Sequence, residues 1–230
     1  NDQNVFFYAN YSSNDYSFTG VGFTRNEIGR IIWNTTDFTS SPLYQVKMID
    51  LDNDNVKDEI VAGSNSAYAF HPNGSSYWTK SVYNYGHNLI VSDLDGDGFE
   101  NDILSAAHNG YVRIINESSS NTLAWSIDYS GTNGGSAIIG DLDGDGAEDD
   151  LVIIRDIDNT RVVMAFNTST GLSWESLWNY TIPYNDDIME LVISDLDEDG
   201  LDDIAGVTVD NGGTTYAFAL NGSNGNTIWN

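Results

Sequence analysis

Residues 93–104 read DLDGDGFENDIL: aspartates stand at alternate positions, a glycine follows the third aspartate, and an aliphatic segment ends the stretch. Comparable windows begin at Asp50, Asp141 and Asp195. The windows 50–59, 93–102, 141–150 and 195–203 hold 22 of the 35 acidic residues, and the other 13 stand against 8 lysines and arginines. The formal charge of −27 is thus concentrated in a repeated local feature, which excludes a generally acidic, salt-adapted surface as its main cause.

The overall composition limits the classes of protein to consider. With 230 residues, 40% of them hydrophobic, the chain can bury the core of one large all-β domain. It has no apolar run near the roughly 20 residues that span a bilayer and no signal-like N-terminus, so we expect a soluble segment without membrane insertion. The negative charge excludes nucleic acid as a partner. The absence of cysteine removes disulfides and thiolate metal sites and favours an archaeal or bacterial origin.

The acidic windows belong to a longer repeat, because they begin 43, 48 and 54 residues apart. A β-like segment that ends in an asparagine follows each window, and a segment with a tryptophan comes next. The asparagines are Asn73, Asn116, Asn167 and Asn221, and the tryptophans are Trp78, Trp125, Trp178 and Trp229. In the second complete unit the pattern predicts strands over 89–92, 103–107, 111–115 and 123–129. No window has a sustained helical period.

Four short strands in a unit of this length are typical of one propeller blade. We therefore predict an all-β fold, a β-propeller of four-stranded blades with the acidic loops between the first and second strands. Residues 1–40 read as a partial copy without the first strand and the acidic loop, because GRIIW at 29–33 matches GNTIW at 225–229.

About five blades are then visible, the first of them incomplete. We expect one domain over 1–230, with repeats near 1–40, 41–84, 85–131, 132–184 and 185–230. Three arrangements remain open: a five-bladed ring without one strand, part of a larger ring, or a ring that a neighbouring chain completes.

The acidic loops have the oxygen ligands and the sharp turn that a calcium ion requires. Alternating aspartates would point inward, and the residue after the turn would offer its carbonyl. The predicted ligands of this kind are Asp50, Asp52, Asp54 and Val56; Asp93, Asp95, Asp97 and Phe99; Asp141, Asp143, Asp145 and Ala147; and Asp195, Asp197, Asp199 and Leu201. Asn55 replaces the turn glycine in the first loop, where asparagine tolerates the left-handed conformation.

A later acid is expected to close each ligand shell. In the fourth loop this acid is Asp203. The first three loops are one residue longer, so counting from the loop start gives Asp58, Asn101 and Asp149, whereas counting back from the strand gives Glu59, Asp102 and Asp150. We keep both sets and favour the carboxylate where they differ. Because uncompensated carboxylates within ~4–6 Å repel one another, four such loops predict about four calcium ions. Magnesium fits less well, and an EF-hand would need flanking helices.

The pattern D-x-D-x-D-G-x-x-D before an aliphatic strand resembles the calcium loops of FG-GAP/VCBS repeats, as in integrin-α-type propellers. The match is strongest at 195–204 and good at 93–103 and 141–151. The segment Ala165-Phe166-Asn167, with Gly171 and Trp174 or Trp178 after it, is similar to the repeat of quinoprotein-type propellers. These resemblances imply a calcium-stabilised β-propeller outside the cytoplasm, and they imply no reaction.

Seven Asn-x-Ser/Thr patterns are candidate glycosylation sites. They stand at Asn10, Asn34, Asn73, Asn116, Asn167, Asn179 and Asn221. Four of them follow the third strand of a predicted blade and so share a face with the acidic loops. We predict surface glycosylation there, although turn chemistry also explains asparagine at such positions.

Every repeated feature is architectural, which favours a non-catalytic extracellular or cell-surface component that serves adhesion or assembly. Its partners would be other surface proteins, glycans or copies of itself. One alternative is a carbohydrate-binding lectin that uses the opposite face, with Tyr83, Tyr85, His87, Tyr129, Tyr180 and Tyr184. Another is a propeller enzyme, a quinone-dependent dehydrogenase or a polysaccharide lyase, but no residue cluster interrupts the repeat as an active site would. We expect the tryptophans to pack in the core.

Overall fold

The computed structural model describes residues 4–12, 15–24, 27–35, 43–64, 66–81, 86–107, 111–116, 122–128, 137–157, 160–169, 173–182, 187–209, 213 and 215–229. Residues before Leu43 are described by their backbone alone. The chain divides into two compact units, residues 1–86 and 87–230. No helix that could cross a membrane occurs among the described residues.

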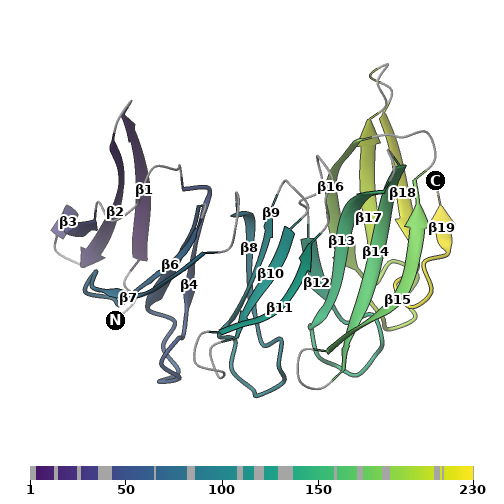
Figure 1. Cartoon of the computed structure of the whole chain (residues 1–230), viewed down its shortest axis with the longest axis horizontal. Coiled ribbons are helices and arrows are strands. Elements are labelled where there is room, and N and C mark those ends of the chain that lie inside the picture. Colours follow the sequence, from purple (N-terminus) through teal and green to yellow (C-terminus); the bar gives the residue numbers. More distant parts are fainter. Residues whose placement is uncertain are drawn as a thin grey trace. The chain divides into compact units, whose positions relative to one another are not determined.

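The first unit contains two antiparallel sheets (Figure 1). A three-stranded sheet consists of β1 (Asn4–Ser12), β2 (Asp15–Thr24) and β3 (Glu27–Thr35). A four-stranded sheet follows with β4 (Gln45–Ile49), β5 (Glu59–Gly63), β6 (Ser66–Phe70) and β7 (Ser76–Ser81). Ile60, Ala62, Tyr68 and Phe70 form the core of that sheet's apolar face.

The second unit contains three four-stranded antiparallel sheets in sequence order (Figure 1). The first has β8 (Gly86–Ser92), β9 (Asp102–Ala107), β10 (Tyr111–Asn116) and β11 (Thr122–Asp128). The second has β12 (Ala137–Gly140), β13 (Asp150–Ile157), β14 (Thr160–Ser169) and β15 (Ser173–Thr181). The third has β16 (Asp187–Ser194), β17 (Asp203–Val209), β18 (Thr215–Leu220) and β19 (Thr227–Trp229).

The middle sheet of this unit buries both of its faces. Along β13, Leu151 and Ile153 pack with Leu104 and Ile114 of the preceding sheet. Val152 on the same strand belongs instead to a cluster that includes residues of β16, β17 and β18. Because successive side chains of a strand point to opposite faces, this double burial explains why the strand is a continuous aliphatic run with little polar alternation. Within this unit, each sheet therefore packs a face against the next.

Every four-stranded sheet has the same irregularity in its last strand pair. The register shifts directly after Ala69, Ile114, Ala165 and Ala219, and these residues pair with Trp78, Trp125, Trp178 and Trp229. In the three-stranded sheet, Gly20 pairs with Trp33 at a comparable shift. The sheets can therefore be aligned residue by residue, and β1–β3 correspond to the last three strands of a unit.

The fold-class prediction of an all-β chain of four-stranded units is confirmed. The strands predicted in the second complete unit agree with β8 to β11 to within three residues at each end. The expectation of one domain over the whole chain stays a prediction. The expected core position of the tryptophans holds for Trp78 and Trp178, each 8% exposed, but is wrong for Trp229, which is 48% exposed. Trp178 is covered by the following sheet, where its Nε1 donates to the carbonyl of Gly222, whereas no described sheet follows β19.

Candidate metal centres

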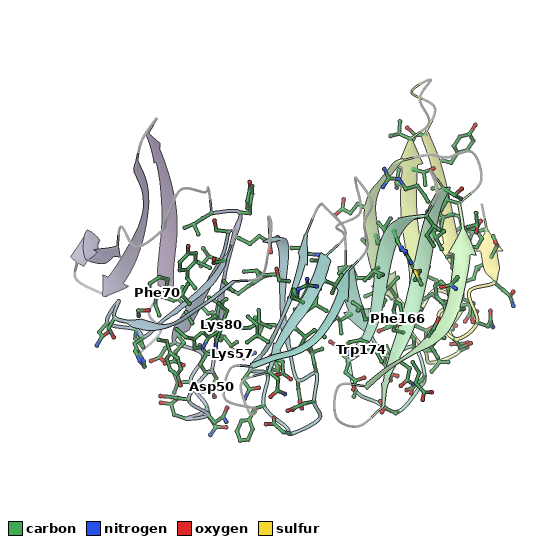
Figure 2. All side chains as sticks on the ribbon, viewed as in Figure 1. Asp50, Lys57, Phe70, Lys80, Phe166 and Trp174 are labelled. Atoms are coloured by element: carbon green, nitrogen blue, oxygen red, sulfur yellow. The ribbon has the colours of Figure 1, made fainter. Side chains whose placement is uncertain are left out.

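Each acidic window forms the loop between the first and second strands of a four-stranded sheet. In every loop three carboxylates offer oxygens that lie within 4.8 Å of one another. The groups are Asp50, Asp52 and Asp54; Asp93, Asp95 and Asp102; Asp141, Asp143 and Asp150; and Asp195, Asp197 and Asp199. Figure 2 labels Asp50, where the first loop leaves β4. All of these residues are among the predicted ligands, but the groups of the second and third loops contain the closing acid in place of Asp97 and Asp145. Their role as metal ligands stays a prediction.

Backbone N–H groups fix the carboxylates in these loops. In the third loop, Asp141 accepts hydrogen bonds from the N–H groups of Gly144 at 2.7 Å and Gly146 at 3.0 Å. Asp143 accepts from the N–H of Asp145 at 3.0 Å, and Asp145 accepts from the N–H of Ala147 at 2.8 Å. The other loops repeat the bonds to the first and third aspartates, and the first two loops also repeat the bond to the second aspartate. Because each oxygen has two lone pairs, an oxygen that accepts one such bond can still face a cation.

Two residues in each loop adopt the left-handed conformation that makes this winding possible. Glycine fills both positions in the second and third loops, at Gly96, Gly98, Gly144 and Gly146. The first loop has Asn53 at φ 59° and Asn55 at φ 67°, and the fourth has Glu198 at φ 62° before Gly200. The prediction that Asn55 tolerates this conformation is confirmed. The other left-handed position was not foreseen, because it lies between two aspartates rather than after the third.

One of the two candidate closing acids holds an equivalent buried position in all four loops. Glu59, Asp102, Asp150 and Asp203 begin the second strand of each sheet and are 1% exposed or less. Each accepts a hydrogen bond from the backbone N–H of the loop's second residue, at 2.8–3.0 Å. These are the residues found by counting back from the strand. The residues found by counting from the loop start, Asp58, Asn101 and Asp149, stand one position earlier and do not align with Asp203.

The predicted carbonyl ligands lie in the same loops, and two of them already accept a backbone hydrogen bond. The carbonyl of Val56 accepts from the N–H of Asp58, and that of Phe99 accepts from the N–H of Asn101, both at 2.9 Å. Ala147 and Leu201 hold the matching positions of the third and fourth loops, and each donates its own N–H to the preceding aspartate. A second lone pair on each carbonyl oxygen remains for a hard cation.

The closing acid of the first loop, Glu59, has a raised pKa. Burial raises the pKa of Glu59 to about 7, and Asp58 and Asp52 raise it further while the backbone N–H of Leu51 opposes the shift. A buried carboxylate among other carboxylates is costly to ionise without a compensating cation. The donor set is made of oxygen alone and is pre-oriented by the backbone, so it fits a hard dication such as calcium.

Three of the predicted glycosylation asparagines reach into the acidic loops. Asn116 Nδ2 donates to Asp95 Oδ2 at 2.5 Å, and Asn167 Nδ2 donates to Asp143 Oδ2. Asn221 Nδ2 donates to Oδ2 of Asp197 at 3.2 Å and of Asp199 at 3.4 Å. Sequence reasoning missed this role, although the near-constant spacing from the first aspartate, 23 to 26 residues, was the available signal.

The burial of Asn116 argues against its glycosylation, because a residue only 2% exposed has little room for a glycan, and glycosylation of the other sites stays a prediction. Asn73 was expected at the position equivalent to Asn116 but does not lie there. The aligned sheets place His71 at the position of Asn116, whereas Asn73 lies in the exposed turn after β6 and accepts from the N–H of Ser75 at 2.8 Å. Asn179 is exposed on β15. Asn10 and Asn34 lie on β1 and β3, whose side chains are outside the described part of the chain.

Neighbouring loops of the second unit are joined directly. The N–H of Asp141 donates to Asp202 Oδ2 at 3.0 Å, and the N–H of Asp202 donates back to the carbonyl of Asp141 at 2.9 Å. Ser92 Oγ donates to the carbonyl of Glu148 at 3.0 Å. The loops after β8, β12 and β16 therefore form a connected row, in which the end of one loop contacts the start of the preceding one.

The tyrosines proposed for a lectin face are mostly outside the described residues. Tyr83, Tyr85, Tyr129 and Tyr184 are among these, as is the side chain of His87. Tyr180 is described: it is half-buried on β15, and its ring stacks on Phe218 with centroids 6.1 Å apart. This contact supports the packing explanation for Tyr180.

Comparisons with solved structures identify the fold. The chain matches the Dos1 propeller with a TM-score of 0.61 and 12% identity, over 97% of this chain and 56% of that one. It matches the C-terminal WD40 domain of Sif2 with a TM-score of 0.59 and 12% identity, over 93% and 55% of the two chains. It matches BBS1N in complex with ARL6DN with a TM-score of 0.56 and 11% identity, over 94% and 65%.

The chain thus spans a little over half to two thirds of the length of these structures. No family model matches it, and a search of curated proteins finds no match. The sheet order and these likenesses together show that the chain has a β-propeller fold, in which the four-stranded sheets are the blades.

Proposed function

We propose that this chain is a calcium-stabilised β-propeller of the FG-GAP/VCBS type that works outside the cell as a non-catalytic surface module for adhesion or assembly. The observation that carries the proposal is the repeated loop: four blades each gather three carboxylates within 4.8 Å on a backbone scaffold of the same design. A single such loop would be weak support. Four such loops at equivalent positions in four blades favour a shared role, the binding of a dication.

The bound ion would be held by the aspartates of each loop together with the closing acid. Calcium would neutralise carboxylates that otherwise repel one another, and it would tie the first two strands of a blade together. Modest sites of this kind are filled only where calcium is abundant, which favours an extracellular location. Protein partners are the favoured class, because a rigid propeller offers loop-lined faces and the described site residues include no arrangement for a reaction.

Metal analysis of the purified protein tests the calcium proposal. Protein dialysed against a calcium buffer should contain about four calcium ions per chain by mass spectrometry of the metal content. The double variant Asp143→Asn/Asp145→Asn should contain one ion fewer. A wild-type chain that retains no calcium and titrates without heat would refute the proposal. The cellular location is tested separately by protease treatment of intact source cells, which should remove the protein.

A further inference from the structure

We propose that Asn116, Asn167 and Asn221 are positioning residues, each of which orients the second aspartate of an acidic loop, and that this role accounts for their Asn-x-Ser/Thr pattern. This inference rests on the proposed calcium binding. It concerns residues that lie on a different strand from the loop, 21 to 24 positions after the aspartate they contact.

The contact is the same in three blades. Each asparagine follows the third strand's bulge by two residues and donates its Nδ2 to Oδ2 of the aspartate at the third loop position, which is Asp95, Asp143 or Asp197. Two of these aspartates also accept at Oδ1 from the backbone of their own loop, at 3.1 Å for Asp95 and 3.0 Å for Asp143. The carboxylate is thereby held from two directions, one of them outside the loop.

The fourth loop shows why a serine belongs to the pattern. Ser223 Oγ donates to Asn221 Oδ1 at 2.8 Å. This bond occupies the amide oxygen and directs Nδ2 toward the aspartates, which settles the orientation of the amide by its hydrogen bonds. In the fourth blade the Asn-x-Ser spacing therefore has a structural role, because the hydroxyl of Ser223 orients the amide that contacts the aspartates.

The first loop provides a natural contrast. His71 stands where the other blades have asparagine, and its ring packs against Tyr77 with centroids 4.5 Å apart. Asn73 carries an acceptor pattern of the same kind, but it lies in the turn. Ligating carboxylates are commonly held by outer hydrogen bonds, and losing such a partner typically weakens metal binding about 10- to 100-fold. Three sites of this chain should depend on the asparagines, and the first should not.

The test is a calcium titration of the triple variant Asn116→Ala/Asn167→Ala/Asn221→Ala against a chromophoric chelator. Wild type should show about four sites, and the variant should show three sites weakened by about 10- to 100-fold with one unchanged. Asn73→Ala is the matched control and should titrate as wild type. If the triple variant fails to fold, the single variants Asn167→Ala and Asn221→Ala are titrated with calcium instead, and each should show one weakened site.

Two further readouts separate positioning from a merely structural role. Terbium bound in place of calcium should have a shorter luminescence lifetime in Asn167→Ala, because a displaced carboxylate admits water to the ion. Ser223→Ala should weaken the fourth site, and Ser223→Thr, which keeps the hydroxyl, should restore it. Lower stability in chelator with unchanged calcium affinity would overturn the inference.

The outcomes also distinguish this inference from the proposed function. A wild-type chain that binds calcium together with asparagine variants of unaltered affinity would overturn the positioning role alone. A wild-type chain that binds no calcium would overturn both. A glycan found on Asn167 or Asn221 of the native protein would likewise overturn the inference, because the modified nitrogen would have to leave the loop.

Discussion

The first acidic loop, residues 50–59, and the third, residues 141–150, have the same backbone design but differ in sequence, both within the loop and at the third-strand residue that faces it. Asn53 and Asn55 replace the two left-handed glycines, glutamate replaces aspartate as the closing acid, and histidine replaces the asparagine that reaches in from the third strand. The hydrogen bonds to the first, third and fifth residues are nevertheless retained in both.

This comparison separates the residues that fix the backbone conformation of the loop from those that should set its metal affinity. Alternating aspartates and two left-handed residues are enough to wind the backbone, since both loops have them. The closing acid and the outer asparagine vary without changing that winding, so they are the features that should set metal affinity. We therefore expect the first loop to be the weakest of the four calcium sites.

Calcium removal should have the largest effect and should expose this difference. Each site contributes about 2.7 kcal/mol when calcium exceeds its dissociation constant about a hundredfold, so a chelator should lower the melting temperature strongly. Hydrogen exchange followed during a calcium titration should protect the Gly146 amide at lower calcium than the Asn55 amide. Simultaneous protection of both amides would show that the differences between the loops do not affect affinity.

Loss of the closing acid should be the next largest effect, and unequal between blades. Asp203 accepts from the N–H groups of Leu196, Asp197 and Gly222, so Asp203→Ala leaves three donors without their acceptor. We expect a loss of about 3 kcal/mol in metal-free unfolding free energy.

Glu59 accepts from the N–H of Leu51 and is costly to ionise, so Glu59→Ala should cost about 1 kcal/mol. Urea unfolding with matched m-values measures both losses. Equal losses would mean that the number of N–H donors to the closing acid does not determine the loss of unfolding free energy.

The pH dependence of metal-free stability should depend on Glu59. Its pKa is about 7 in the folded chain and near 4.5 in the unfolded chain, so between these values the folded state holds a proton that the unfolded state has released. Stability without metal should consequently fall as the pH rises from about 4.5 to 7, by on the order of 2 kcal/mol. Glu59→Gln should remove that part of the slope, and saturating calcium should reverse it. An unchanged slope in Glu59→Gln would assign the dependence to other carboxylates.

The periodic features of the fold were predictable from the sequence because they repeat in chemistry as well as in spacing. Strand positions, the tryptophan strands and the places of the four acidic loops all follow from short local patterns. Which carboxylates of a loop lie together does not, because Asp102 and Asp150 stand in their groups where the pattern suggests Asp97 and Asp145. The continuous aliphatic run at 151–154 also indicated a strand, although its burial on both faces depends on neighbouring sheets.

The features that sequence did not predict depend on contacts between strands. The bulge after Ala69 aligns His71, and not Asn73, with Asn116, and no local pattern reveals a shift in strand register. The amide of Asn116 has the same sequence signature whether it faces solvent or a carboxylate 21 residues away. The bridge between Asp141 and Asp202 joins residues of different blades, so only their packing shows it.

The smallest expected effect tests whether backbone conformation alone distinguishes glycine from asparagine in these loops. Gly146 has φ 89°, and a Cβ built there meets no atom within 4 Å, so Gly146→Ala should cost only the left-handed penalty of about 1 to 2 kcal/mol. Gly146→Asn should cost less than half of that, because asparagine adopts this region more readily, and the reverse change Asn55→Gly should be nearly neutral. Thermal unfolding in chelator measures all three. If Gly146→Asn were as costly as Gly146→Ala, the first loop's asparagines would need a compensating interaction that the third loop does not have, and the two loops would no longer share one backbone design.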